Sequence, residues 1–296
     1  MKLKLQKITL ENDGIFSIKL DPEVNFPDTL YKYYYLNKNS IDVIKNNTLH
    51  FSHSFNMNDL MDGSFLIWDI DEMVADYMKK NNALPEEKIK YLRIIIQKFS
   101  NEYLKYLGTF CACENYTNDL LWSHYTNERG FCIQLDTKKI KESLKNFTSY
   151  FFPINYGELR QINLMNYCLK REENGQTFYD ANIPIFYSLT NKEEFWEYEK
   201  EWRIVVRNKD FREFTNPQIM INEETKNIER ENLKLRNISF SPDIFKRIIL
   251  STLFFNNTRF ASSEFSNMRV KYNFALTDEK EILKELTFTN FKNSNL

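Results

Sequence analysis

Glycine is scarce in this 296-residue sequence, which has only six, and no two of them lie close together. A dinucleotide-binding fingerprint or a P-loop needs clustered glycines, because backbone N–H groups must come close to the phosphates of the ligand. The sequence therefore argues against a Rossmann dehydrogenase and against a Walker-type ATPase.

Long apolar runs and cysteines are also few. No stretch approaches the roughly 18 uncharged apolar residues that a membrane span requires. The N-terminal residues alternate between apolar and polar and lack the apolar core of a signal peptide. We therefore expect a cytoplasmic protein with no membrane partner. The four cysteines are too few and too unevenly spaced for a disulfide scaffold, so we expect reduced thiols.

An excess of charge of one sign is missing as well. The chain has 40 basic and 41 acidic residues and a net charge of −1, so it has no global electrostatic footprint for DNA or RNA. We expect no general binding of nucleic acids. What the sequence does have is 42% hydrophobic and 16% aromatic residues, enough for a large core in a folded protein.

The patterning along the chain predicts a single α+β domain over residues 1–296 that is rich in strands. There are no repeats and no long flexible linkers. The parts that we expect within the domain are, in chain order, an N-terminal β-hairpin (1–28), a strand–helix–strand unit (29–54), a helical insertion (69–107) and a C-terminal α/β extension (238–296).

Three segments in the middle of the chain carry further expectations. Helical spacing of apolar residues predicts helices over 137–146 and 158–170. The short apolar run "IPIFYSL" (183–189) is a candidate strand, because apolar runs of this length are typical of buried strands.

The segment "YEKEWRIVVR" (198–207) places charges directly in front of a strand pattern. Because side chains alternate between the two faces of a strand, Glu199, Glu201 and Arg203 would share one face, while the opposite face has the pattern of a core. Two carboxylates on one face repel each other. At least one of them should have a raised pKa unless a cation lies nearby, and Arg203 is such a cation.

The same charges are also compatible with an ordinary ion pair on an edge strand in water. Trp196, Tyr198 and Trp202, however, crowd the same part of the sequence and would exclude water. Aromatic walls around paired carboxylates favour a cleft. We therefore expect Glu201, with Glu199 beside it, to be the catalytic group.

Two groups of residues could be considered as metal ligands. Zinc ligand types occur together in the set Cys111, Cys113, His124 and Cys132, but their spacing is not a common structural zinc pattern, and free cysteines are usually buried. Ligand types suited to Mg²⁺ or Ca²⁺ occur in the set Asn56, Asn58, Asp59 and Asp62, but these residues are also turn formers and do not match an EF-hand. We expect no metal.

His124 and Tyr125 end a short predicted helix, next to a turn at Gly130. A His–Tyr pair at the end of an element can contact a ligand. The alternative is that His124 only ties the end of the helix to the backbone.

Four blocks in this order resemble domain-of-unknown-function family 2971, a group of bacterial proteins. The blocks are "LYKYYYL", "LLWSHYTNERGFCIQLD", "YEKEWRIV" and "DIFKRIIL". The resemblance covers about residues 29–250. The chain departs from the family pattern at Tyr34, where the family usually has Arg, and in a stretched "FNMNDLMD" block.

A weaker likeness is to the ADP-ribosyltransferase fold, whose split sheet has a strand–helix–strand opening and a late strand led by Glu-x-Glu. By position, Lys32 or Tyr33 would stand for its first-strand His or Arg, Ser52 for its second-strand Ser/Thr, and Glu201 for its catalytic Glu. The chain lacks the His or Arg and the Ser-Thr-Ser triplet. This fold binds its dinucleotide without a glycine-rich loop, in agreement with the six glycines.

The likeness implies cleavage of the nicotinamide–ribose bond of NAD⁺, in which Glu201 stabilises the oxocarbenium ion. Tyr33 or Tyr125 would stack on the nicotinamide, and Lys32 or Arg203 would pair with the pyrophosphate. The residues that we expect to contact NAD are Lys32, Tyr33, Ser52, His124, Tyr125 and Arg203.

The leading hypothesis is thus an NAD-using ADP-ribosyltransferase-like enzyme that modifies a macromolecule or hydrolyses NAD, as a bacterial toxin or defence effector. One alternative is a metal-dependent nuclease that uses Asp59, Asp62 and the carboxylates at 199 and 201. The other is a module without enzymatic activity that senses a nucleotide or binds a protein partner. The acceptor and the oligomeric state do not follow from the sequence.

Overall fold

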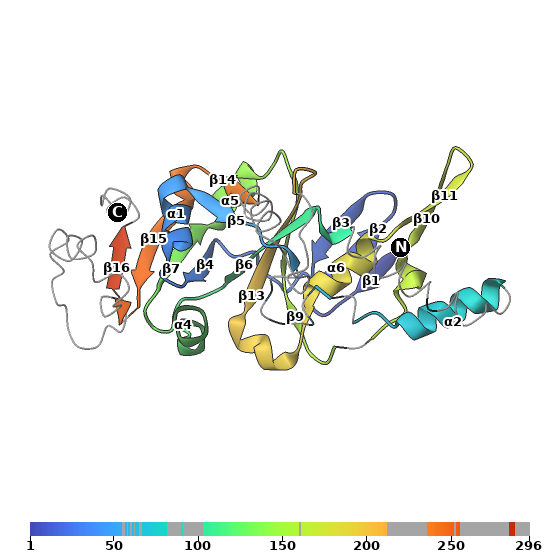
Figure 1. Cartoon of the computed structure of the whole chain (residues 1–296), viewed down its shortest axis with the longest axis horizontal. Coiled ribbons are helices and arrows are strands. Elements are labelled where there is room, and N and C mark those ends of the chain that lie inside the picture. The colour runs from blue at the N-terminus through green and yellow to red at the C-terminus, as the bar shows by residue number, and fades with distance from the viewer. Residues whose placement is uncertain are drawn as a thin grey trace, which may run out of the picture.

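The structure is a computed structural model that describes most of the chain (Figure 1). The described residues are 1–54, 57, 59, 61, 63–64, 67–81, 90, 103–159, 161–211, 236–251, 253–254 and 284–287.

A seven-stranded sheet forms the centre of the molecule, and its pairings are all antiparallel. In spatial order its strands are β16 (Lys284–Thr287), β15 (Phe245–Leu250), β7 (Phe131–Asp136), β4 (Thr29–Tyr34), β6 (Leu107–Cys113), β13 (Glu201–Arg207) and β8 (Thr148–Pro153). Together with the helices, this sheet confirms the predicted α+β class.

The sheet splits between β4 and β6. These strands share one residue pair, Tyr31 with Cys113, whereas β4 pairs with β7 over six residues and β6 pairs with β13 over seven. Beyond the shared pair the two halves diverge. At the wide end of the gap Ser52 and Thr109 exchange two backbone hydrogen bonds of 2.9 and 2.8 Å.

The expected strand–helix–strand unit consists of β4, α1 (Lys38–Asn46) and β5 (Thr48–His50). Asn37 caps α1, and the Ser40 hydroxyl accepts from the Asn37 N–H, which completes a capping box. The strand β5 pairs with β14 (Asn237–Ser239). The chain then continues to Ser52. Two separate segments of this unit, β4 and the residues that follow β5, therefore lie at the split in the sheet.

The N-terminal residues form a separate antiparallel sheet in the order β1 (Lys2–Lys4), β2 (Ile8–Asn12) and β3 (Phe16–Leu20). Gly14, with φ of 121°, lies in the turn of the expected hairpin. This sheet lies in the half of the molecule opposite β16 (Figure 1). Phe16 packs against Tyr150 and Phe186.

The candidate strand at 183–189 is wrong, because this run forms the helix α6 (Asn182–Thr190). Every residue of α6 is buried, and a helix that is buried all round has no polar stripe from which its period could be recognised. Pro184 lies in the first turn, where its missing N–H breaks no helical hydrogen bond.

The predicted helix at 158–170 is also wrong. This stretch contains the 3₁₀ helix η3 (Leu164–Tyr167) and the start of a hairpin of β10 (Leu169–Glu173) and β11 (Gln176–Asp180). Asn174 and Gly175 form its turn with φ of 51° and 76°, the Asn-Gly pattern of a tight hairpin. The Asn-Gly pair is thus a sequence signal for the hairpin that begins at Leu169.

The remaining elements among the described residues are helices and short strands. They are α2 (Ile70–Asn81), α4 (Asp119–Thr126), α5 (Thr137–Ser143), β9 (Asn155–Tyr156), β12 (Asn191–Lys192), η4 (Glu194–Glu199) and η5 (Pro242–Ile244). The helix α2 lies in the expected insertion, whose residues 82–89 and 91–102 fall outside the description. In the expected C-terminal extension, β15 and β16 join the central sheet. No helix in the described part of the chain is long and apolar enough to cross a membrane.

Both faces of β13 are covered by apolar side chains. Trp202, Ile204 and Val206 pack in one core cluster, and Val205 packs in a second cluster with α6. The first six residues of the strand are buried, so its charged residues Glu201 and Arg203 are carried into the interior.

Gly130 permits the close contact of β7 with the end of β4. A Cβ atom at this position would overlap the carbonyl oxygen of Tyr34 and lie 2.8 Å from the Cβ of Thr126. We expect Gly130→Ala to lower the free energy of unfolding by about 2 kcal/mol or more, because backbone in a packed region must shift. Urea denaturation measures the change.

Gly157→Ala is the matched control, because a Cβ atom there meets nothing within 4 Å. We expect it to change the free energy of unfolding by less than about 1 kcal/mol. Equal losses in the two variants would contradict the role given to Gly130.

Candidate functional site

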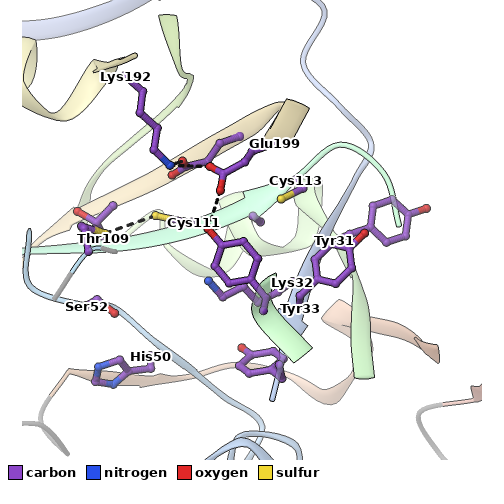
Figure 2. Close-up of a pocket in the computed structure, with 15 residues that line it drawn as sticks. Tyr31, Lys32, Tyr33, His50, Ser52, Thr109, Cys111, Cys113, Lys192 and Glu199 are labelled. Carbon is purple, nitrogen blue, oxygen red and sulfur yellow. Dashed lines mark hydrogen bonds and ion pairs between the residues drawn. The ribbon is translucent and has the colours of Figure 1, made fainter. Parts of the chain in front are cut away.

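A cavity of about 310 Å³ occupies the split between β4 and β6. Its walls come from β4, β6, the chain around β5, α4, and the segment that joins β12 to β13. In Figure 2, Lys192 and Glu199 lie at one end of the cavity, and Ser52 and His50 lie at the other. The cavity therefore gathers polar side chains from segments that are far apart in the sequence.

Four buried charged side chains form a cluster at the first end. Lys192 Nζ donates to Glu199 Oε2 at 2.6 Å and to Glu201 Oε2 at 3.2 Å. Arg203 Nε donates to Glu201 Oε1 at 2.6 Å, and its Nη1 donates to the carbonyl of Leu189 at 2.9 Å. None of the four residues is more than 5% exposed. Two cations thus balance two carboxylates in the interior.

The two glutamates converge in a different way from the one predicted. Only Glu201 belongs to β13, whereas Glu199 ends the 3₁₀ helix η4. Lys200, between them, is left-handed with φ of 43°. The prediction that Glu199 and Glu201 share one strand face is therefore wrong. The left-handed residue changes the chain direction, and Lys192 then draws the two carboxylates together.

The environments of the two carboxylates shift their pKa values in opposite directions. Burial acts to raise the pKa of Glu201, but the nearby Arg203 and Lys192 outweigh it and hold that pKa well below its usual range. For Glu199, burial and the charge of Glu201 raise the pKa, against the opposing effect of Lys192. Glu201 is thus the carboxylate that stays ionised, and Glu199 is the one that takes up a proton more readily.

Tyr125 and Tyr33 are two of the four tyrosines that line the cavity. Tyr125 donates its hydroxyl to Glu199 Oε1 at 2.6 Å, and burial together with Glu199 raises the pKa of Tyr125. Tyr33 is 5% exposed, donates to the carbonyl of Asn115 at 3.2 Å and packs edge-on against Trp122. Burial also raises its pKa. Both phenols therefore remain neutral hydrogen-bond donors at ordinary pH.

Six of the eight residues predicted for the site line the same cavity. They are Lys32, Tyr33, Ser52, Tyr125, Glu199 and Glu201. Arg203 and His124 do not line it. The Arg203 side chain is fully buried behind Glu201, so the structure does not bring it to a ligand. His124 is exposed on α4, with Nδ1 2.9 Å from the Tyr198 hydroxyl.

The residues considered as metal ligands are described only in part. All four cysteines are free thiols, of which Cys111 and Cys113 line the cavity and Cys132 is in the core. Asp59 accepts from the N–H of Met61, as a turn residue does. Asn56, Asn58 and Asp62 lie outside the described residues. Among those that are described, no three His, Cys, Asp or Glu residues are grouped to hold a metal ion.

Lys192 is the main residue of the site that the sequence did not reveal. It belongs to the two-residue strand β12, which pairs in parallel with β9. The signal was present, because Lys192 comes seven residues before Glu199 and two buried carboxylates need compensating charge. Several other lysines and arginines are equally near in sequence, however, and only the fold selects among them.

Comparison with known protein families gives one result. Residues 121–204 match the family described as "Protein of unknown function (DUF2971)", which confirms the resemblance to that family. The matched segment contains Tyr125, Lys192 and both glutamates, whereas Lys32 and Ser52 lie before it. The searches of curated proteins and of solved structures found no match.

Glu201→Gln should destabilise the protein, because it leaves Lys192 and Arg203 buried with one negative charge fewer. We expect a loss of about 3–5 kcal/mol at pH 7. The pKa of Glu201 is lower in the folded than in the unfolded state, so its contribution is complete above the unfolded value and is lost as the pH falls below it. Urea denaturation between pH 3 and pH 8 measures both effects.

Glu197→Gln is the control, since Glu197 is exposed on the same helix η4. It should leave the urea midpoint nearly unchanged over the whole pH range. If the two variants gave parallel stability curves, the cluster would not have the assigned energetic role.

Proposed function

We propose that this chain is an NAD-using enzyme of the ADP-ribosyltransferase type. It would cleave the bond between nicotinamide and ribose and transfer ADP-ribose to a macromolecule or to water. The observation that carries the proposal is the meeting of Lys32, Ser52 and Glu201 on one cavity at a split in the sheet. These are the positions that the likeness to the fold assigns to ligand binding and catalysis.

Glu201 has the properties that the bond cleavage requires. When the C–N bond breaks, nicotinamide leaves with the bonding electron pair, and positive charge develops on the ribose. A fixed carboxylate beside the ribose stabilises that charge without reorganising. Arg203 and Lys192 hold Glu201 in place and ionised. The attacking hydroxyl or water then forms a bond to the ribose carbon, and Glu199 accepts its proton.

The charge balance of the cavity favours an anionic ligand. Lys192 and Arg203 compensate the two glutamates. Lys32 also lines the cavity, and in the described part of the chain no carboxylate forms an ion pair with it. A phosphate group of the ligand would supply the missing negative charge.

The size of the cavity limits which part of the ligand is enclosed. A volume of about 310 Å³ lies at the lower end of the range of roughly 300–1,000 Å³ that is usual for small-molecule sites. We therefore assign the cavity to the nicotinamide–ribose half of NAD. Tyr125 would border the ring, and the adenosine half would lie outside.

A binding module without turnover is the second candidate, and one observation favours it. Both carboxylates already accept hydrogen bonds from cations or from Tyr125, so neither is free of protein partners. Such a module would bind the nucleotide and release no nicotinamide.

Nicotinamide release from NAD tests the proposed activity, with and without cell lysate as a source of acceptor. We expect Glu201→Gln to lower kcat at least about 100-fold, because it removes the charge that stabilises the transition state. Glu197→Gln should be as active as wild type. The variants are assayed at a temperature at which circular dichroism shows them folded. Undiminished release by folded Glu201→Gln would overturn the assignment.

Lys32→Met tests the phosphate contact separately. Loss of a charged hydrogen bond to the ligand should raise KM roughly tenfold or more, with a smaller effect on kcat. Lys45→Met, on α1, is the matched control and should leave KM unchanged.

The alternatives give different results in the same samples. Absence of nicotinamide release, together with an NAD-induced rise in Tm that Lys32→Met abolishes, would identify the binding module. Nuclease activity that a chelator removes would identify the metal-dependent nuclease. A toxin or defence effector that consumes NAD should lower the NAD content of bacteria on induced expression, and Glu201→Gln should prevent this.

A further inference from the structure

Lys192 lies between the two carboxylates of the site. Its ammonium group contacts Glu199 at 2.6 Å and Glu201 at 3.2 Å, and it is 4.5 Å from the centre of the Trp196 ring. The residue is 5% exposed. It lines the cavity beside both glutamates, and it takes no part in the bond changes of the reaction.

We propose that Lys192 is a positioning residue, whose ammonium bridges Glu199 and Glu201 and keeps the other oxygen of Glu199, Oε1, directed at Tyr125 and the cavity. Its consequence for catalysis rests on the proposed function, whereas its effect on the two carboxylates rests on geometry alone.

The contacts of the four charged residues indicate that Arg203 and Lys192 hold different carboxylates. Arg203 fixes Glu201 from behind, through Nε at 2.6 Å. Lys192 reaches Glu201 as well, but its shorter contact is to Glu199. Each oxygen of Glu199 thus has a partner, since Oε2 accepts from Lys192 and Oε1 accepts from Tyr125. Removal of Lys192 leaves Glu199 beside Glu201 without the cation that bridges them.

Other groups around Glu199 also influence its titration. The titratable groups that face it are Glu201 on β13, Lys192 on β12, Tyr125 on α4, Cys111 and Cys113 on β6, Tyr156 on β9, Tyr198 on η4 and, across the cavity, Lys32 on β4, while Arg203 on β13 lies behind Glu201. Of the side chains with a hydrogen bond to Glu199 given above, Lys192 is the cation and Tyr125 is neutral. Lys192 therefore has the strongest opposing effect on proton uptake by Glu199.

Carbon-13 NMR of labelled glutamate carboxyl groups tests the bridge without any turnover. Signals are assigned with Glu199→Gln and Glu201→Gln. In Lys192→Met we expect the titration midpoint of Glu199 to rise by about one pH unit or more, and in Lys192→Arg we expect it to stay near the wild-type value. Lys200→Met is the control, because Lys200 is an exposed lysine next to Glu199, and it should leave the midpoint unchanged.

An unchanged midpoint in folded Lys192→Met would overturn the proposal. If Lys192→Met does not fold, a measurement on the wild-type protein tests the proposal. The nitrogen-15 signal of the Lys192 ammonium must shift at the pH at which Glu199 titrates. A Lys192 signal that does not shift at this pH would also refute the bridge.

The rate of nicotinamide release supplies a readout that a purely structural role would not change. In Lys192→Met the acid limb of the kcat profile should move to higher pH, together with the Glu199 midpoint, while KM changes less than threefold. Lys192→Arg should restore the wild-type profile. If the wild type releases no nicotinamide, the proposed enzymatic function fails, and the NMR titrations still decide the role of Lys192.

Discussion

The separation of β4 from β6 after a single residue pair is the constraint on which the site depends. The two strands share only the pair of Tyr31 with Cys113, and each then keeps its hydrogen bonds with its outer neighbour, β7 or β13. The facing edges of β4 and β6 are therefore free to separate. Ser52 closes the wide end through its backbone pairing with Thr109. A continuous sheet would have left no room for the cavity of about 310 Å³.

The second constraint is electrostatic. Two buried carboxylates are tolerated beside one another only with buried cations, because desolvation and mutual repulsion both oppose their charge. Arg203 arrives on the same strand as Glu201, and Lys192 arrives from β12. The resulting asymmetry separates the two pKa values, lowering that of Glu201 and raising that of Glu199. Carboxylates with pKa values that differ in this way can take different roles in one reaction.

Local sequence patterns predicted much of the fold. The α+β class, the β4–α1–β5 unit and the strand after Glu201 follow from patterns a few residues long, and the structure contains them. The run at 183–189 was misassigned, because α6 is buried on every side and shows no helical periodicity. The helix expected at 158–170 is wrong, since this stretch contains only the short 3₁₀ helix η3 and then enters the β10–β11 hairpin, which the Asn174–Gly175 turn favours.

The sequence by itself determined the α+β class, the β4–α1–β5 unit, the N-terminal hairpin around Gly14, and that acidic and aromatic residues crowd the start of β13. These features depend on backbone periodicity and on the conformational preferences of neighbouring residues. Only the tertiary structure decided that Lys192 bridges the carboxylates, that Arg203 lies behind Glu201 and away from the cavity, and that His124 faces outward. The distance of each of these side chains from the cavity depends on how strands from distant parts of the chain pair and where they diverge, and no local pattern contains that information.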